Sequence, residues 1–144
     1  MNNKAVLMSF HPDWVEHIFM RKDKQFEVRK RAPLLAPPYK VYVYCTLGQP
    51  FLKYESMFFK GTLNGLVVGE FTCTHNYERS APWHNQCLGT RLSPRQLAEY
   101  SKGKNLVFMR IDNPILFDKP KELKEFGVTR PPQNFQFCRV LENG

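Results

Sequence analysis

Short runs of apolar residues, several of them alternating with polar ones, predict a chain made mainly of strands. These runs occupy residues 4–10, 25–30, 41–46, 66–74, 105–111 and 134–140. Helix signals begin at Pro12, at the capping box from Ser93 to Gln96 and at Pro120. The predicted order is strand, helix, three strands, helix, strand, helix, strand.

This order predicts an α+β fold with one domain over residues 1–144. The helices are too few and too unevenly spaced for a doubly wound parallel sheet. We expect a small mixed β-barrel of about six strands with two or three short helices at its ends, because closure removes exposed strand edges. Residues 75–92 are expected to form a long polar loop, and Gly69 indicates a bulge or a close backbone approach.

Composition is that of a globular protein, with 42% hydrophobic residues among 144. No apolar stretch approaches the length of a membrane span, and residues 5–10 are too short for a secretory signal. The four cysteines show no disulfide framework. We therefore expect a cytoplasmic protein with reduced thiols, no cofactor and no membrane partner; no protein partner is indicated.

Net charge changes this picture, because the chain carries +8 and half of it lies in residues 21–31, with six basic and two acidic side chains. Clustered lysine and arginine residues are typical of a phosphate-binding surface. A solvated helix end followed by an edge strand would have the same composition.

Within this cluster, Lys24, Glu27 and Arg29 form a K-x-x-E-x-R motif. It resembles the core motif of the ASCH domain, a member of the PUA-like superfamily. The preceding strand and helix, and the Pro-Pro-Gln-Asn-Phe segment at 131–135, are also similar to small bacterial and phage members. The resemblance covers the whole chain and implies a PUA-like fold. The chain departs from the family at Lys22, where a glycine is usual, and at Gln25, where a threonine is common.

The residues of the motif suit a ligand site on their own chemistry. Glu27 and Arg29 lie on the same strand face, and Lys24 precedes the strand. Carboxylates accept hydrogen bonds from base amino groups, and arginine makes planar contacts to phosphates or bases. The motif predicts a cleft for RNA or a modified nucleotide, with DNA also possible, and the candidate residues are Ser9, His11, Lys22, Lys24, Glu27, Arg29, Lys30 and Arg31. The alternative is an internal Glu27–Arg29 ion pair that only holds the strand.

Aromatic residues offer stacking surfaces for unpaired bases. Tyr44 and Trp83 are the candidates for the site, and Trp83 is expected to be exposed in its polar loop. Trp14 and Tyr42 carry the same chemistry, but Trp14 falls on the apolar stripe of its predicted helix and so suits a core position.

Two further functional hypotheses remain, and one activity known in the ASCH family is set aside. One ASCH branch deacylates a modified nucleoside with a threonine three residues after the motif lysine; that position is Glu27 here, so we do not transfer this activity. A nucleoside- or RNA-processing enzyme could instead use Lys24 and Glu27 as acid and base, if burial shifts their pKa values. A protein-interaction domain would use an exposed apolar patch in residues 51–59.

A zinc site is the last alternative, and we expect no metal. Cys73, His75, His84 and Cys87 have suitable ligand types. The single residue between Cys73 and His75 is shorter than the spacing of ordinary zinc motifs, so a buried cysteine with loop histidines is the simpler interpretation.

Overall fold

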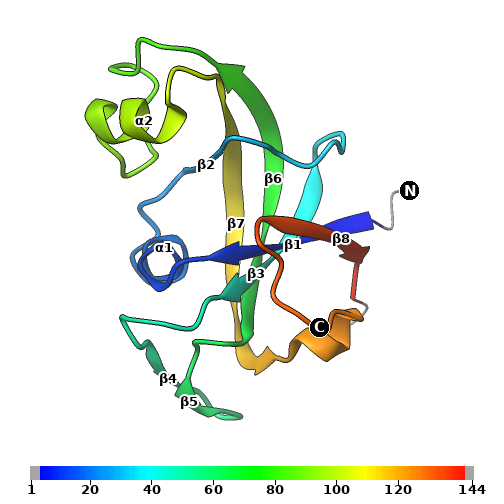
Figure 1. The fold of residues 1–144 in the computed structure, drawn as a ribbon. Coiled ribbons are helices and arrows are strands. Elements are labelled where there is room, and N and C mark those ends of the chain that lie inside the picture. The colour runs from blue at the N-terminus through cyan, green and yellow to red at the C-terminus, as the bar shows by residue number, and fades with distance from the viewer. Residues whose placement is uncertain (1–3, 142–144) are drawn as a thin grey trace.

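A six-stranded mixed sheet forms the body of the protein in a computed structural model that describes residues 4–141 (Figure 1). The elements along the chain are β1 (Lys4–Phe10), α1 (Pro12–Val15), the π-helical turn η1 (Glu16–Arg21), β2 (Phe26–Arg29), β3 (Tyr39–Cys45), β4 (Lys53–Glu55), β5 (Lys60–Thr62), β6 (Val67–Arg79), α2 (Pro94–Ser101), β7 (Leu106–Lys121), the 3-10 turn η2 (Leu123–Phe126) and β8 (Phe135–Arg139). The α+β class is confirmed. Among the described residues no helix is long and apolar enough to cross a membrane.

The sheet is open, so the expected closed barrel is wrong. Its strand order is β2-β7-β6-β3-β1-β8, which leaves β2 and β8 as edges, and β4 and β5 form a separate hairpin. β1 and β3 pair in parallel, whereas the other neighbouring strands of the sheet pair antiparallel. The edge strand β2 exposes few unpaired backbone groups even though the sheet is open, because it is four residues long. A loop also covers its start, where the backbone N–H groups of Gln25 and Phe26 both donate to Gly89 O.

The longest pair, β6 and β7, extends well beyond the predicted strands and curves through the molecule (Figure 1). Residues 75–79 continue β6, so the predicted loop is shorter than expected. Residues 112–121 continue β7 through irregular pairing, and Asn113 in this segment has a φ of 52°. Bulges of this kind allow a strand to contain a proline such as Pro114. They also interrupt the alternation of apolar and polar residues by which a strand is recognised in a sequence. The predicted helix at 120–126 is accordingly reduced to η2.

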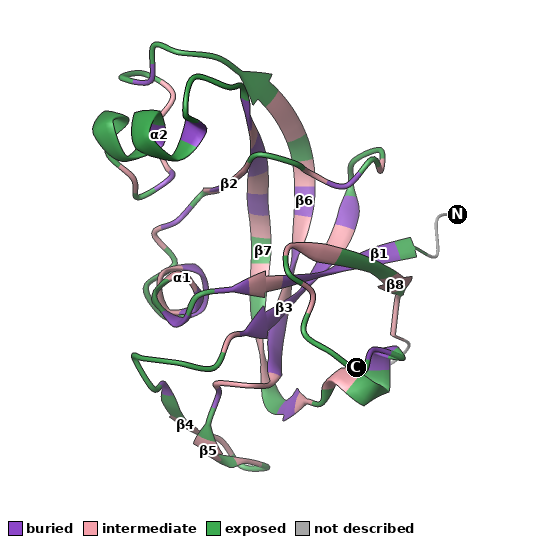
Figure 2. Ribbon diagram, in the orientation of Figure 1, coloured by how far each residue is buried: buried purple, intermediate pink, exposed green. Residues whose placement is uncertain are grey.

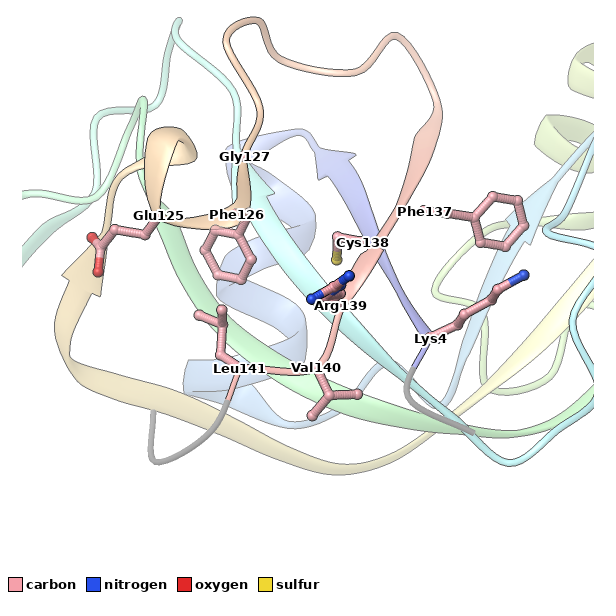
Figure 3. A pocket seen from close by; sticks show the side chains of 9 residues that line it. All are labelled: Lys4, Glu125, Phe126, Gly127, Phe137, Cys138, Arg139, Val140 and Leu141. Carbon is pink, nitrogen blue, oxygen red and sulfur yellow. The ribbon is translucent and has the colours of Figure 1, made fainter. Parts of the chain in front are cut away.

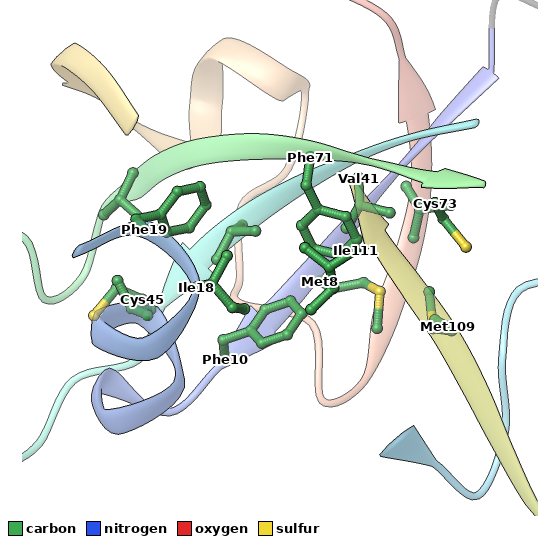
Figure 4. Close-up of a cluster of buried hydrophobic side chains, with 14 of the residues drawn as sticks. Met8, Phe10, Ile18, Phe19, Val41, Cys45, Phe71, Cys73, Met109 and Ile111 are labelled. Atoms are coloured by element: carbon green, nitrogen blue, oxygen red, sulfur yellow. The ribbon is translucent and has the colours of Figure 1, made fainter. Parts of the chain in front are cut away.

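Two apolar clusters cover the two faces of the central strands. Alternate residues of β1 face opposite sides: Val6, Met8 and Phe10 join the cluster under α1 and η1, where Phe10 and Phe71 meet edge to face with ring centroids 6.1 Å apart (Figure 4). Ala5 and Leu7 join the second cluster, which includes the chain around η2. Figure 2 shows the central strands buried and α2 largely exposed.

Gly69 lies where β6 passes closest to its neighbours, which confirms the close approach expected from the sequence. A Cβ at this position would collide with the carbonyl oxygen of Ile115 and with the ring of Phe19. A side chain here would separate β6 from β7 and displace η1.

Candidate nucleotide pocket

The start of β2 brings the three motif side chains together. Glu27 and Arg29 alternate onto one face of the strand, and Arg29 Nε lies 2.5 Å from Glu27 Oε2. Lys24 approaches from the preceding turn, with its Nζ 3.5 Å from Glu27 Oε1. The carboxylate of Glu27 therefore lies between two cations.

Lys24 is an unusually enclosed lysine. Its side chain is 0% exposed, and Nζ donates a hydrogen bond of 2.7 Å to Thr90 O. The same ammonium lies 4.2 Å from the ring centroid of Trp14, in cation–π geometry. Burial lowers the pKa of Lys24, and the attraction of Glu27 opposes this effect. The site thus holds an ammonium that releases its proton more easily than an exposed lysine does.

Arg29 ties β2 to the opposite side of the sheet. Its guanidinium donates to Asn134 Oδ1 at 2.6 Å, just before β8, and to Ser9 O at 2.8 Å, near the end of β1. It also lies 4.9 Å from the ring centroid of Phe10. Asn134 completes the link by donating to Arg31 O at 3.1 Å. Side chains, in place of backbone pairing, therefore connect the region of β2 with the end of β1 and the start of β8.

A pocket of about 310 Å³ opens beside these side chains. It lies between the motif, α1 and α2, and we call it the motif pocket. Its lining residues are Ser9, Trp14, Lys24, Glu27, Val28, Arg29, Leu92, Gln96 and Tyr100. The volume lies at the lower end of the range typical of small-molecule sites. The pocket thus combines a charged wall with two aromatic side chains, those of Trp14 and Tyr100.

Three basic residues of the cluster, Lys22, Lys30 and Arg31, are exposed near the motif and are here called the basic rim. Lys30 Nζ lies 4.9 Å from the ring centroid of Tyr100, which itself lines the pocket. Lys22 follows η1 with a φ of 55°, in the left-handed region of the backbone. A glycine, which is usual at this position in the ASCH family, adopts this conformation more easily than a lysine does.

Several candidates lie outside the motif pocket. His11 is exposed and caps α1, where its Nδ1 accepts from the backbone N–H of Asp13 at 3.2 Å. Tyr44 is 3% exposed in the second apolar cluster, on the face of β3 opposite Val43. The expectation that Trp83 is exposed is wrong, because it is 5% exposed and packs near Phe108. Neither ring offers a free stacking surface.

The structure adds residues that sequence reasoning missed: Thr90, Gln96, Tyr100 and Asn134. Thr90 contributes only its backbone carbonyl to Lys24, and such a contact leaves no side-chain signal. Asn134 did lie in the Pro-Pro-Gln-Asn-Phe segment that resembles the ASCH family, but its contact with Arg29 spans 105 positions of the chain.

The proposed zinc ligands do not form a cluster. Cys73 is buried, with Sγ 3.0 Å from Asn76 Oδ1, while the exposed ring of His75 stacks on Tyr77. Cys87 Sγ contacts His84 O at 3.3 Å. Within residues 4–141 no three histidine, cysteine or acidic side chains are grouped as metal ligands would be.

Two other surface features are separate from the motif pocket. A hollow of about 1030 Å³ lies between η2, β8 and the start of β1, and its walls include Phe126, Phe137 and Leu141 (Figure 3). The hairpin region exposes Phe51 and Met57, at 60% and 89%, so residues 51–59 do present apolar surface.

Solved structures resemble this fold, although the comparisons of sequence find no match. No protein-family model and no curated protein sequence matches the chain. The crystal structure of ASCH from Zymomonas mobilis matches with a TM-score of 0.70 and 20% identity, over 96% of this chain and 90% of that one. A serine-to-alanine variant of that protein matches with a TM-score of 0.69 and 20% identity, over 95% and 89% of the two chains. A tyrosine-to-phenylalanine variant gives 0.69 and 19%, over 94% and 90%. The chain therefore has the fold of the ASCH protein, as the K-x-x-E-x-R motif led us to expect.

Proposed function

We propose that the protein binds RNA or a modified nucleotide, with one base or nucleoside in the motif pocket. The observation that carries this proposal is the convergence of Lys24, Glu27 and Arg29 on one small pocket that also contains Trp14 and Tyr100. Each carboxylate oxygen of Glu27 has a second lone pair, so it accepts a base amino group while still paired with its cations.

The basic rim supplies the contacts to phosphate. Lys22, Lys30 and Arg31 are exposed, and they flank the motif within the most basic segment of a chain of net charge +8. Phosphate contacts position a strand without reading its sequence, whereas contacts inside the pocket select the base. The ASCH fold is consistent with this division between rim and pocket.

The rim is tested by replacing Lys22, Lys30 and Arg31 together with glutamine. The matched control replaces Lys53, Lys60 and Lys119, which are also exposed and carry the same total charge. Binding of a labelled single-stranded RNA is followed by fluorescence anisotropy at several salt concentrations. If each rim residue contacts one phosphate, the slope of log K against log salt falls by about 2 in the rim variant. Equal losses in both variants would show that only total charge matters and would contradict the assignment.

The pocket is tested with nucleosides and mononucleotides. The chain has two tryptophans, so a Trp83→Phe variant leaves Trp14 as the only tryptophan, in the wall of the motif pocket. We expect nucleotide binding to change Trp14 fluorescence and Tyr100→Leu to weaken this binding. No response to any nucleotide, together with no RNA binding by the unmodified protein, would refute the proposed function.

A processing enzyme is the second candidate, and the enclosed Lys24 favours it. General acid–base chemistry needs a group whose pKa lies nearer to neutrality than usual, and burial lowers the pKa of Lys24 beside Glu27. Incubation with RNA and with modified nucleosides tests this reaction class. Turnover that is lost in Glu27→Gln, at a temperature where that variant is shown to be folded, would support it. If no turnover is detected, binding without a reaction remains the proposed function.

A further inference from the structure

A second small pocket lies next to β2, and no part of the proposed function uses it. It has a volume of about 230 Å³, and its lining includes three aromatic residues, Phe26, Tyr77 and Phe108. Arg79 and the side chains of Asn85 and Gln86 complete most of the lining. We call it the aromatic pocket.

Cations accompany the aromatic rings of this region. The guanidinium of Arg79 lies 4.9 Å from the centroid of Tyr77, and that of Arg110 lies 5.3 Å from the centroid of Phe26. His75 stacks on Tyr77 with an interplanar angle of 3°. Alternating arginine and aromatic side chains on a strand surface are the elements that stack and neutralise single-stranded nucleic acid.

One polar atom of the lining has no partner. Gln86 Nε2 donates to Ser80 O and to Pro82 O, both at 2.6 Å, which fixes the orientation of the amide. Its Oε1 is buried and accepts no hydrogen bond from any residue in the range 4–141. An unpaired buried acceptor is unfavourable. Because this oxygen has almost no accessible surface, a ligand N–H group satisfies it only after a shift of the Gln86 side chain toward the pocket. The amino groups of adenine and cytosine are such donors.

The two pockets share the edge strand β2. Phe26 lines the aromatic pocket, whereas Glu27, the next residue of β2, lines the motif pocket. The loop after β6 contributes to both, with Gln86 in the first and Leu92 in the second. A flexible strand that passes over this edge can therefore reach both pockets.

We infer that the aromatic pocket is a second base-binding subsite, which takes an amino-bearing base of the same single-stranded RNA whose other base occupies the motif pocket. This inference rests on the proposed function. The positive charge of Arg79, of Arg110 and of the whole chain favours a polyanion over a second copy of this protein as the occupant.

The test compares Tyr77→Leu with Tyr77→Phe, because stacking needs the ring and not the hydroxyl. The probes are labelled oligonucleotides of eight adenosines and of eight uridines. We expect Tyr77→Leu to weaken octa-adenylate binding by about 5- to 150-fold, the usual effect of losing one stacked base. Tyr77→Phe should bind within about twofold of the unmodified protein, and the unmodified protein should prefer octa-adenylate to octa-uridylate. Phe137→Leu, at an exposed aromatic outside both pockets, is the matched control.

AMP binding at the motif pocket separates the two proposals. It is read from Trp14 fluorescence in the Trp83→Phe background and should be unchanged by Tyr77→Leu. If Tyr77→Leu binds octa-adenylate as tightly as the unmodified protein does, the second subsite is refuted while the motif pocket stands. If Tyr77→Leu weakens AMP and octa-adenylate equally, the effect is not specific to a second subsite, which also refutes it. If the unmodified protein binds neither AMP nor octa-adenylate, the second subsite is refuted, and the full set of nucleotides and RNA described above then decides the proposed function.

Discussion

Glu27 holds two cations at the wall of the motif pocket, and its replacement by glutamine should destabilise the fold. Its carboxylate lies 3.5 Å from Lys24 Nζ and 2.5 Å from Arg29 Nε. The side chains of Lys24 and Glu27 are 0% and 6% exposed. Glu27→Gln preserves the shape of the side chain and removes its charge, which leaves the ammonium of Lys24 enclosed without a counter-charge.

The size of this effect follows from the chemistry of Lys24. Removing one partner of a buried ion pair typically lowers the free energy of unfolding by about 3–5 kcal/mol. The ability of Lys24 to release its proton sets an upper bound on this loss, because a neutral amine no longer needs a counter-charge. Releasing it at pH 7, about 3.5 units below the ordinary pKa of 10.5, costs about 5 kcal/mol. We therefore expect a loss of about 3–5 kcal/mol, a large share of the stability of an ordinary domain.

The loss of stability in Glu27→Gln should therefore depend on pH. Burial lowers the pKa of Lys24 and Glu27 opposes this, so the pKa falls further when the carboxylate is removed. Below the folded-state pKa of Lys24 the penalty is complete. Above that value the folded protein has released the proton while the unfolded chain still keeps it, so the penalty shrinks as the pH rises toward 10.5. At pH 9 the upper bound is about 2 kcal/mol. The difference in stability between the two proteins should narrow from pH 7 to pH 9.

Urea unfolding followed by circular dichroism measures this difference. With a urea m-value of about 2 kcal/mol/M, the midpoint should fall by about 1.5–2.5 M at pH 7. Glu99→Gln is the control, because Glu99 pairs with Arg95 on the surface, where the two side chains are 68% and 89% exposed. It should change stability by less than about 1 kcal/mol. A loss below 1 kcal/mol for Glu27→Gln at pH 7, or a difference that widens with pH, would refute this reasoning.

Two further predictions concern the turn after η1 and a buried thiol. Lys22→Gly should raise the free energy of unfolding by up to about 1 kcal/mol, because glycine relieves the strain of the left-handed backbone at a φ of 55°. The control is Lys104→Gly, at an exposed position outside the left-handed region. A urea midpoint for Lys22→Gly no higher than that of the control would contradict this prediction. Burial raises the pKa of the Cys45 thiol to about 12, so the folded state keeps a proton that the unfolded chain releases from about pH 9 upward. Stability should fall above pH 9 by up to about 1.4 kcal/mol per pH unit from this group, and Cys45→Ala should flatten the fall; parallel curves for the two proteins would argue against it.

The sequence predicted best what is encoded locally. The capping box of α2 forms between Ser93 and Gln96, as its residues indicate. Strand alternation placed Glu27 and Arg29 on one face, which is how the structure arranges them. These features depend on residues only a few positions apart, so no knowledge of the tertiary fold is needed to infer them.

What the sequence left out depends on contacts between distant segments. The extension of β7 past Pro114 relies on irregular pairing with β6, and proline there argues against a strand when the chain is read alone. Trp83 looked like a loop aromatic because its neighbours are polar. It is buried because the loop folds back onto Phe108 and Leu97, which lie in other elements. Burial of an aromatic in a long loop is a property of packing and not of local sequence.

The choice between a structural ion pair and a ligand site does not have to be exclusive, because the Glu27–Arg29 ion pair itself borders the motif pocket. Glu27 and Arg29 do pair, and Arg29 also links β2 to Asn134 and Ser9. Stability alone gives no reason for this chemistry, since apolar side chains in place of a buried ion pair are often neutral or stabilising. A structural pair also needs no enclosed lysine beside it and no adjoining hollow lined by Trp14. The costly placement of Lys24 at the wall of a pocket is what gives the ligand-binding interpretation its advantage over the structural one.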